Sequence, residues 1–167
     1  KQNEGVINVY SEPGRGTTFK IYLPRFVGQP VEASAPSMDE IPQGHGEWVL
    51  LVEDETAIRT LAKMMLHQLG YTVLAAGAPD EALHLAGEHA GRIQLLITDV
   101  VMPEMNGREL ATLCMASNPD MKCLFMSGYT ANVIAHHGVL DDGVQFIQKP
   151  FSMRDLGLKL RQVLESS

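Results

Sequence analysis

Short apolar runs alternate with amphipathic segments from Trp48 to Leu164. The clearest amphipathic segment places its apolar residues on one helical face, and these are Ile58, Leu61, Ala62, Met65, Leu66 and Leu69. Apolar strands that alternate with helices are typical of a parallel sheet covered on both faces. The pattern therefore predicts an α/β fold built from five strand–helix units over residues 48–165.

The expected boundaries follow from these periods and from the turn residues between them. Strands are expected at 49–52, 72–75, 93–98, 122–126 and 145–148, and helices at 58–69, 79–89, 108–117, 132–136 and from Ser152 onward. The side chain of Ser152 can cap the last helix together with Asp155, three residues later.

The first residues have a different pattern. Residues 5–24 predict a β-hairpin with a turn at Pro13–Gly16, because apolar and polar side chains alternate on either side of it. After it, the composition shifts to Pro, Ala, Ser, Gly and acids without a hydrophobic period, which is typical of a linker. We therefore expect a hairpin at 1–25, a linker at 26–47 and the α/β domain at 48–167.

Charge and composition exclude several classes of partner. Thirteen basic and 20 acidic residues give a net charge of −7, which disfavours nonspecific binding to nucleic acid or to an anionic membrane surface. No apolar run approaches the roughly 20 residues that span a bilayer. Cys114 and Cys123 lack metal-site spacing, which indicates reduced, buried thiols. We expect a cytoplasmic segment of a longer protein, and the sequence leaves open whether the parent protein is anchored in a membrane upstream of it.

Polar residues follow four of the apolar runs. Glu53 and Asp54 follow VLLV, Asp99 follows LLIT, Ser127 ends a run and Lys149 follows FIQ. Adjacent acids after a strand can simply favour the start of a helix, but carboxyl ends of parallel strands meet in one crevice. We therefore expect three acids, a hydroxyl and an ammonium to lie close together.

This combination predicts Mg²⁺-assisted phosphoryl chemistry. Crowded carboxylates need a cation, and Mg²⁺ takes one or two carboxylates together with water and phosphate oxygens. The expected ligands are Asp54 and Asp99, with Glu53 direct or through water and the main-chain carbonyl of Val101. Asp99 is the expected nucleophile. The Lys149 ammonium and the Ser127 hydroxyl would contact phosphoryl oxygens. Without the other residues of the site, Lys149 would suggest only a solvated strand end and Ser127 only a turn residue.

The motifs LLVEDE at 50–55, DVVMPEMNG at 99–107, MSGY at 126–129 and KPF at 149–151 occur in this order. Residues 48–164 thus resemble a response-regulator receiver domain of two-component signalling. The resemblance implies a flavodoxin-like fold with strand order 2-1-3-4-5, phosphorylation of Asp99, and a switch made by Ser127 and Phe146. Most receivers have Tyr where this chain has Phe146. The resemblance also implies a cis Lys149–Pro150 bond.

Two positions beside the site, Val101 and Tyr129, are expected to hinder water and to slow hydrolysis of the acyl phosphate. His136 and His137 are adjacent on a predicted helix and point about 100° apart, which argues against a shared metal ion.

The hairpin resembles the last two strands of a histidine-kinase ATPase domain through Gly14–Phe19 and Leu23–Arg25. Hybrid sensor kinases have this order of segments. The adenine-binding segments of such a domain are missing from the sequence, so ATP binding is not expected.

The leading hypothesis is a receiver of a bacterial hybrid histidine kinase. It would take a phosphoryl group from the kinase core of the parent protein and pass it to a histidine phosphotransfer protein, and its own catalysis would be limited to its aspartyl phosphate. One alternative is a Mg²⁺-dependent phosphohydrolase, although the D-x-D motif is missing because Val101 stands two residues after Asp99. Another is a receiver-like interaction module that is never phosphorylated, which the complete set of acids, hydroxyl and lysine argues against.

Overall fold

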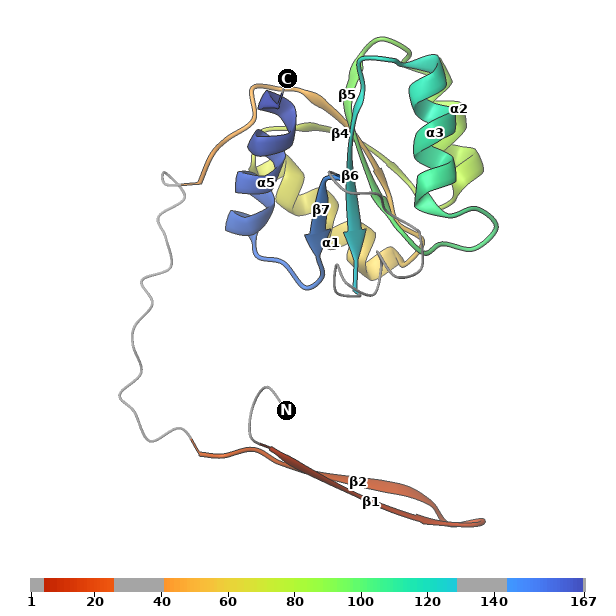
Figure 1. The fold of residues 1–167 in the computed structure, drawn as a ribbon, viewed down its shortest axis with the longest axis vertical. Coiled ribbons are helices and arrows are strands. Elements are labelled where there is room, and N and C mark those ends of the chain that lie inside the picture. Colours follow the sequence, from red (N-terminus) through yellow and green to blue (C-terminus); the bar gives the residue numbers. More distant parts are fainter. Residues whose placement is uncertain (1–4, 26–40, 129–143, 167) are drawn as a thin grey trace. The chain divides into compact units, whose positions relative to one another are not determined.

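The computed structural model describes residues 5–25, 41–128 and 144–166, which belong to two compact units. The larger unit contains a five-stranded sheet in the order β4-β3-β5-β6-β7, and all of its strand pairs are parallel (Figure 1). In order along the chain this is 2-1-3-4-5, so the predicted flavodoxin-like α/β fold is confirmed.

The strands and helices lie close to their predicted positions. The strands of this sheet are β3 (Trp48–Val52), β4 (Thr72–Ala76), β5 (Ile93–Asp99), β6 (Lys122–Ser127) and β7 (Phe146–Gln148). The helices are α1 (Thr56–Gln68), α2 (Pro79–Glu88), α3 (Gly107–Ser117) and α5 (Met153–Glu165). The helix predicted at 132–136, with His136 and His137, and Tyr129 lie outside the described residues.

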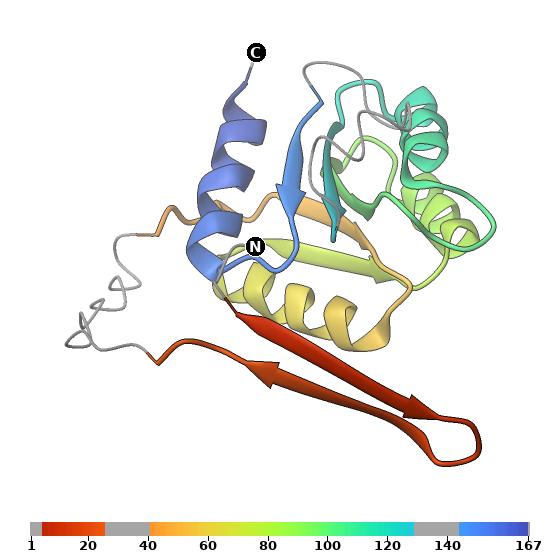
Figure 2. The same cartoon turned by 60° about the horizontal axis from the view of Figure 1, so that its bottom comes forward.

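Helices cover both faces of the sheet. Helices α1 and α5 lie on one face and α2 and α3 on the other (Figures 1 and 2). Successive residues of β3 point to opposite faces, so Val49 and Leu51 pack with the α1–α5 layer, and Leu50 and Val52 with the α2–α3 layer. Burial on both faces explains why this strand is an unbroken apolar run.

Side chains fix the starts of two helices. The Asn106 side chain accepts a hydrogen bond from the Glu109 N–H at the start of α3 (2.9 Å). At the start of α5, Ser152 and Asp155 form a reciprocal capping box, as the sequence predicted. These caps satisfy N–H groups that have no partner inside the helix. None of the helices in the described part of the chain has the length and apolarity that crossing a bilayer requires.

The smaller unit contains the predicted hairpin. Strands β1 (Val6–Glu12) and β2 (Gly16–Tyr22) pair antiparallel, and their turn contains Gly14 at φ +76° and Gly16 at φ +87°. These left-handed conformations cost glycine little. Large apolar side chains of the hairpin, such as Val9 and Phe19, are more than half exposed. Because an isolated two-stranded hairpin is marginal in water, this unit needs further packing.

Residues 41–47, which we call the strap, pack on the larger unit. Gly44 N–H donates to the Leu69 carbonyl (2.7 Å), and Gly46 N–H donates to the Gly70 carbonyl (3.1 Å). The carbonyl of Glu47 accepts from Thr72 N–H (3.0 Å), which leads the strap into the sheet. The composition of the strap predicts a linker, but these hydrogen bonds make it a part of the α/β unit.

The strap is anchored by Ile41, which is 7% exposed and belongs to the core of the α1–α5 layer. Its side chain lies over Gly157 of α5, where a Cβ would come within 2.8 Å of Ile41 Cγ2 and 3.2 Å of the Pro42 carbonyl oxygen. Gly157 therefore makes room for the strap inside a helix, although glycine costs about 1 kcal/mol relative to alanine there. One apolar residue in a polar segment produces no periodic pattern, which is why composition placed the strap in the linker.

We expect Ile41→Ala to lower the free energy of unfolding by about 2 kcal/mol, because it removes buried methyl and methylene groups. Urea unfolding followed by far-UV circular dichroism measures the loss. His45→Ala is the control, because His45 is exposed in the same segment and should stay within about 0.5 kcal/mol of the parent. Equal effects of the two substitutions would show that the strap is not anchored by Ile41.

A double-mutant cycle isolates the contact between Ile41 and Gly157. Gly157→Ala alone should destabilise the domain, since the new Cβ meets Ile41. In the Ile41→Ala background that collision is removed, and the helix propensity of alanine should make the same change neutral or stabilising. Additive effects of the two substitutions would contradict this packing.

Candidate functional site

The polar residues predicted to meet do lie at one edge of the sheet. Lys149, directly after β7, donates a hydrogen bond from Nζ to Asp99 Oδ2 (2.6 Å) and another to Glu53 Oε2 (2.7 Å). Asp99 is the last residue of β5, and Glu53 directly follows β3. The lysine therefore joins the ends of three strands.

Three carboxylates form an acidic cluster around this ammonium. Glu53, Asp54 and Asp99 each offer an oxygen, and these oxygens lie within 4.8 Å of one another. Glu53 is buried, Asp99 is half-buried and Asp54 is exposed. With all groups ionised, three negative charges face one ammonium, which leaves a deficit of two positive charges. Closely spaced oxygen donors with this deficit fit a hard divalent cation such as Mg²⁺.

Burial and hydrogen bonding change the pKa values of Glu53 and Lys149 in opposite directions. Burial raises the pKa of Glu53, because a charge is disfavoured away from water, although the hydrogen bond from Lys149 partly offsets this. Burial alone would lower the pKa of Lys149, but the hydrogen bonds to Asp99 and Glu53 outweigh it and raise that pKa. Lys149 therefore stays charged at neutral pH.

The loop after Asp99 folds back beneath it. Gly107 N–H donates to the Val100 carbonyl (3.1 Å), and a Cβ on Gly107 would collide with the Asp99 carbonyl oxygen. A glycine is thus required where the loop enters α3. Val101 N–H donates to Asp99 Oδ1 (3.3 Å), and the Val101 side chain is 62% exposed beside the acid. The loop holds the Asp99 carboxylate at a fixed place at the edge of the sheet.

The predicted switch residues lie on β6, which pairs with β5, and on β7 at the edge of the sheet. Ser127 ends β6 and is buried, and its carbonyl accepts from Lys149 N–H (2.7 Å). Phe146 begins β7, pairs in register with Phe125 and is half-buried against the α2–α3 layer. The Lys149–Pro150 peptide is cis, as predicted. Ser127 is thus joined through the main chain to the lysine that contacts Asp99.

Arg59 of α1 was not identified from the sequence. Its Nη1 donates to the carbonyls of Glu53 (2.6 Å) and Asp54 (3.1 Å), directly behind the acidic pair. A single arginine one turn into an amphipathic helix reads as a solvated side chain, so only the geometry reveals it.

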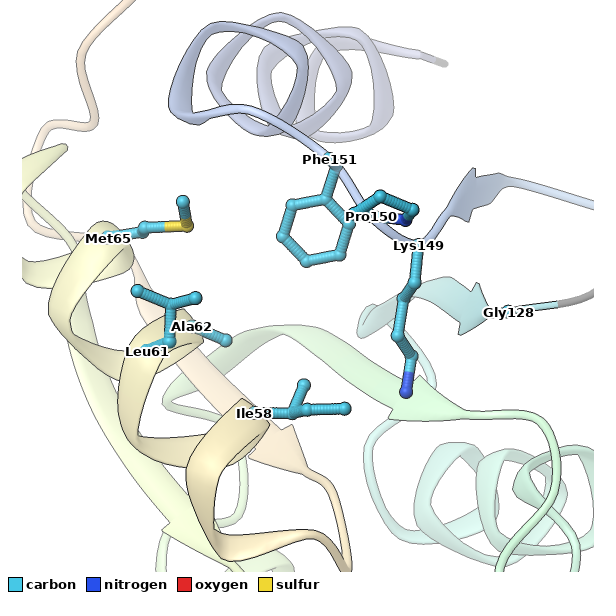
Figure 3. A pocket seen from close by; sticks show the side chains of 8 residues that line it. All are labelled: Ile58, Leu61, Ala62, Met65, Gly128, Lys149, Pro150 and Phe151. Atoms are coloured by element: carbon cyan, nitrogen blue, oxygen red, sulfur yellow. The ribbon is translucent and has the colours of Figure 1, made fainter. Parts of the chain in front are cut away.

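An apolar groove of about 380 Å³ lies beside the acidic cluster (Figure 3). We call it the α1 groove, and it is lined by Ile58, Leu61, Ala62 and Met65 of α1 and by Gly128, Lys149, Pro150 and Phe151. In Figure 3 the ring of Phe151 points from the β7–α5 loop towards α1. Lys149 contributes both to the groove and to the cluster, so the two features are continuous.

Known proteins are similar to this chain in sequence and in fold. Residues 49–161 match the family described as response regulator receiver domain. A crystal structure of the receiver domain from hybrid histidine kinase CckA is 36% identical, with a TM-score of 0.61 over 71% of this chain and 99% of that one. The Vibrio cholerae chemotaxis protein CheY4 is 28% identical, with a TM-score of 0.62 over 71% of this chain and 98% of that one.

Two curated relatives from Brucella abortus differ in how much of their length is matched. Sensor kinase CckA is 38% identical over 99% of this chain, which spans only 18% of that protein. The response regulator receiver protein CpdR is 32% identical over 70% of this chain and 95% of its own length. Residues 49–161 contain the acidic cluster and all five strands of the sheet except the first residue of β3, and this chain therefore belongs to the response regulator receiver domain family of two-component systems.

Proposed function

We propose that this chain is a phosphoacceptor in a phosphorelay and that Asp99 accepts the phosphoryl group. The observation that carries the proposal is the pair of short contacts from Lys149 Nζ to Asp99 and Glu53 inside a cluster of three carboxylates. This lysine contacts two acids that follow or end different strands, one buried and one half-buried. Here it meets a half-buried carboxylate with an exposed acid beside it, where a charged donor can approach from solvent.

In the proposed reaction, an Asp99 carboxylate oxygen attacks the phosphorus of a phosphohistidine. A P–O bond forms as the P–N bond breaks, and its electron pair returns to the imidazole nitrogen, which then takes a proton. The charge that develops on the phosphoryl oxygens needs positive partners. Lys149 supplies one, and the Ser127 hydroxyl supplies a hydrogen bond.

The acidic cluster would hold Mg²⁺ through Asp54 and Asp99, with Glu53 direct or through water and the Val101 carbonyl completing the protein's ligands. The ion would offset the repulsion between an anionic acceptor and an anionic donor. The charge deficit of two at the cluster supports a divalent ion rather than a monovalent one.

We propose that the partners are the kinase core of the parent protein and a histidine phosphotransfer protein. The α1 groove supports this, because it offers an apolar surface to a helix that presents its histidine next to Lys149. Leu61 of the groove is 56% exposed, as is Met64 on the same helix, so α1 presents apolar side chains to solvent. The match to a sensor kinase over 99% of the chain, hairpin included, favours a hybrid-kinase parent.

We further propose that residues 1–25 are the last strands of a kinase ATPase domain, that 26–47 connect them to the receiver, and that 48–167 are the receiver with the strap packed on it. The exposed apolar side chains of the hairpin support this assignment, because they would be covered by the rest of such a domain. Ser127 and Phe146 form the proposed switch: the hydroxyl moves toward the phosphoryl group, and the half-buried ring repacks behind it.

Asp99→Asn should abolish labelling when the chain is incubated with Mg²⁺ and radiolabelled acetyl phosphate, because the amide is not a nucleophile. Mass spectrometry of the intact protein measures the added phosphoryl group. Asp120→Asn is the control, because Asp120 is an exposed acid outside the cluster and should label as the parent does. Removing Mg²⁺ with EDTA should also abolish labelling, and persistent labelling of Asp99→Asn would refute the proposal.

Leu61→Glu should slow transfer from a phosphohistidine donor about tenfold relative to labelling by acetyl phosphate, since about 1.4 kcal/mol of docking energy corresponds to that ratio. The donor is the autophosphorylated kinase core of Brucella abortus CckA. Leu113→Glu is the control: this residue of α3 is 46% exposed and lies outside the α1 groove. An equal loss for both variants would show that the groove does not receive the donor.

A further inference from the structure

Arg59 connects the backbone of the acidic pair to the first turn of α1. Its Nη1 donates to the Glu53 carbonyl (2.6 Å) and the Asp54 carbonyl (3.1 Å), and its Nη2 donates to Thr56 Oγ1 (3.2 Å). A guanidinium has several donors in a planar fork and can hold such acceptors at once. The side chain therefore fixes the segment in which two of the three carboxylates occur.

Apart from the contact of Lys149 with the Glu53 carboxylate (2.7 Å), this segment has few other restraints. The N-cap residue of α1, Glu55, makes no side-chain cap hydrogen bond. Its N–H reaches Glu53 Oε1 only at 3.4 Å, and Glu53 N–H reaches the Ala76 carbonyl at 3.2 Å. The two contacts from Arg59 Nη1 are shorter than both of these main-chain contacts, and they act on the backbone of the loop between β3 and α1, whereas Lys149 contacts the Glu53 carboxylate.

The loop after β4 confines the guanidinium from the other side. A Cβ on Gly77 would lie 3.1 Å from Arg59 Nη1 and 3.2 Å from its Cζ. Gly77 N–H donates to Glu81 Oε2 (2.7 Å), which ties this loop to the start of α2. Arg59 is thus packed between the loops that follow two neighbouring strands, and its position is specified on both sides.

We propose that Arg59 is a positioning residue for divalent cation binding, holding the backbone of Glu53 and Asp54 so that their carboxylates converge with Asp99. Its hydrogen bonds go to two main-chain carbonyls and the Thr56 hydroxyl rather than to the carboxylates, so the acids keep their oxygens for a cation. Groups that orient metal ligands without contacting the metal are worth tenfold or more in affinity. The inference rests on the proposed Mg²⁺ site and adds to it a residue outside the cluster.

The test is isothermal titration of the unphosphorylated chain with Mg²⁺. Arg59→Gln should weaken Mg²⁺ binding about tenfold or more. Arg59→Lys should weaken it similarly, because a single ammonium keeps the charge but lacks the fork. Lys63→Gln is the matched control, since it removes the same charge from an exposed position one turn along α1 and should bind as the parent does.

Each result discriminates. A parent chain that does not bind Mg²⁺ would overturn the proposed cation and this inference together, whereas a binding parent with unchanged Arg59 variants would overturn the inference alone. Full recovery in Arg59→Lys would also overturn it, because charge would then be sufficient.

A purely structural role is tested separately. Thermal unfolding without Mg²⁺ reports the stability of each variant, and the titrations are run where circular dichroism shows the chain folded. If the Arg59 variants do not fold, Gly77→Ala provides the test. The new Cβ would shift the guanidinium from its present position without removing the arginine. A smaller loss of Mg²⁺ affinity in that variant supports the inference, and unchanged affinity overturns it.

Discussion

The contact of Lys149 with both Asp99 and Glu53 is the interaction on which the site depends. An ammonium at the end of β7 offsets part of the repulsion among carboxylates that the parallel sheet places together. Without such a cation, acids this close would bind protons or move apart. The geometry of the sheet creates the electrostatic repulsion, and the residue directly after an edge strand offsets part of it, which leaves the cluster with an excess of negative charge.

Much of this arrangement could be predicted from the sequence. The apolar runs identified the strands because buried parallel strands are apolar on both faces, and the polar residue after each run marked the edge where the side chains meet. The order of strands required the resemblance to receiver domains, since periodicity does not say which strands are neighbours. The capping box at Ser152 was visible because its two residues have a fixed spacing.

Arg59 and Ile41 could not be predicted, for related reasons. The function of Arg59 depends on main-chain carbonyls, which every residue has, so no sequence pattern marks its partners. Ile41 occupies the space that a side chain at position 157 would fill, and Gly157 stands 116 positions later in the sequence. The first contact is local, five and six residues back along the chain, and the second joins distant segments, but neither produces a hydrophobic period or a motif that the sequence could show.

The strap determines where the covalent connection to the upstream segment starts. Because Ile41 belongs to the core of the α1–α5 layer and lies over Gly157 of α5, upstream segments are tethered at the helix layer that also contributes to the α1 groove. A partner carried on the same polypeptide would therefore meet the groove at a high effective concentration, whereas a free protein must compete by affinity. Under the proposed function, attachment through the strap therefore favours a donor on the same polypeptide over a separate one.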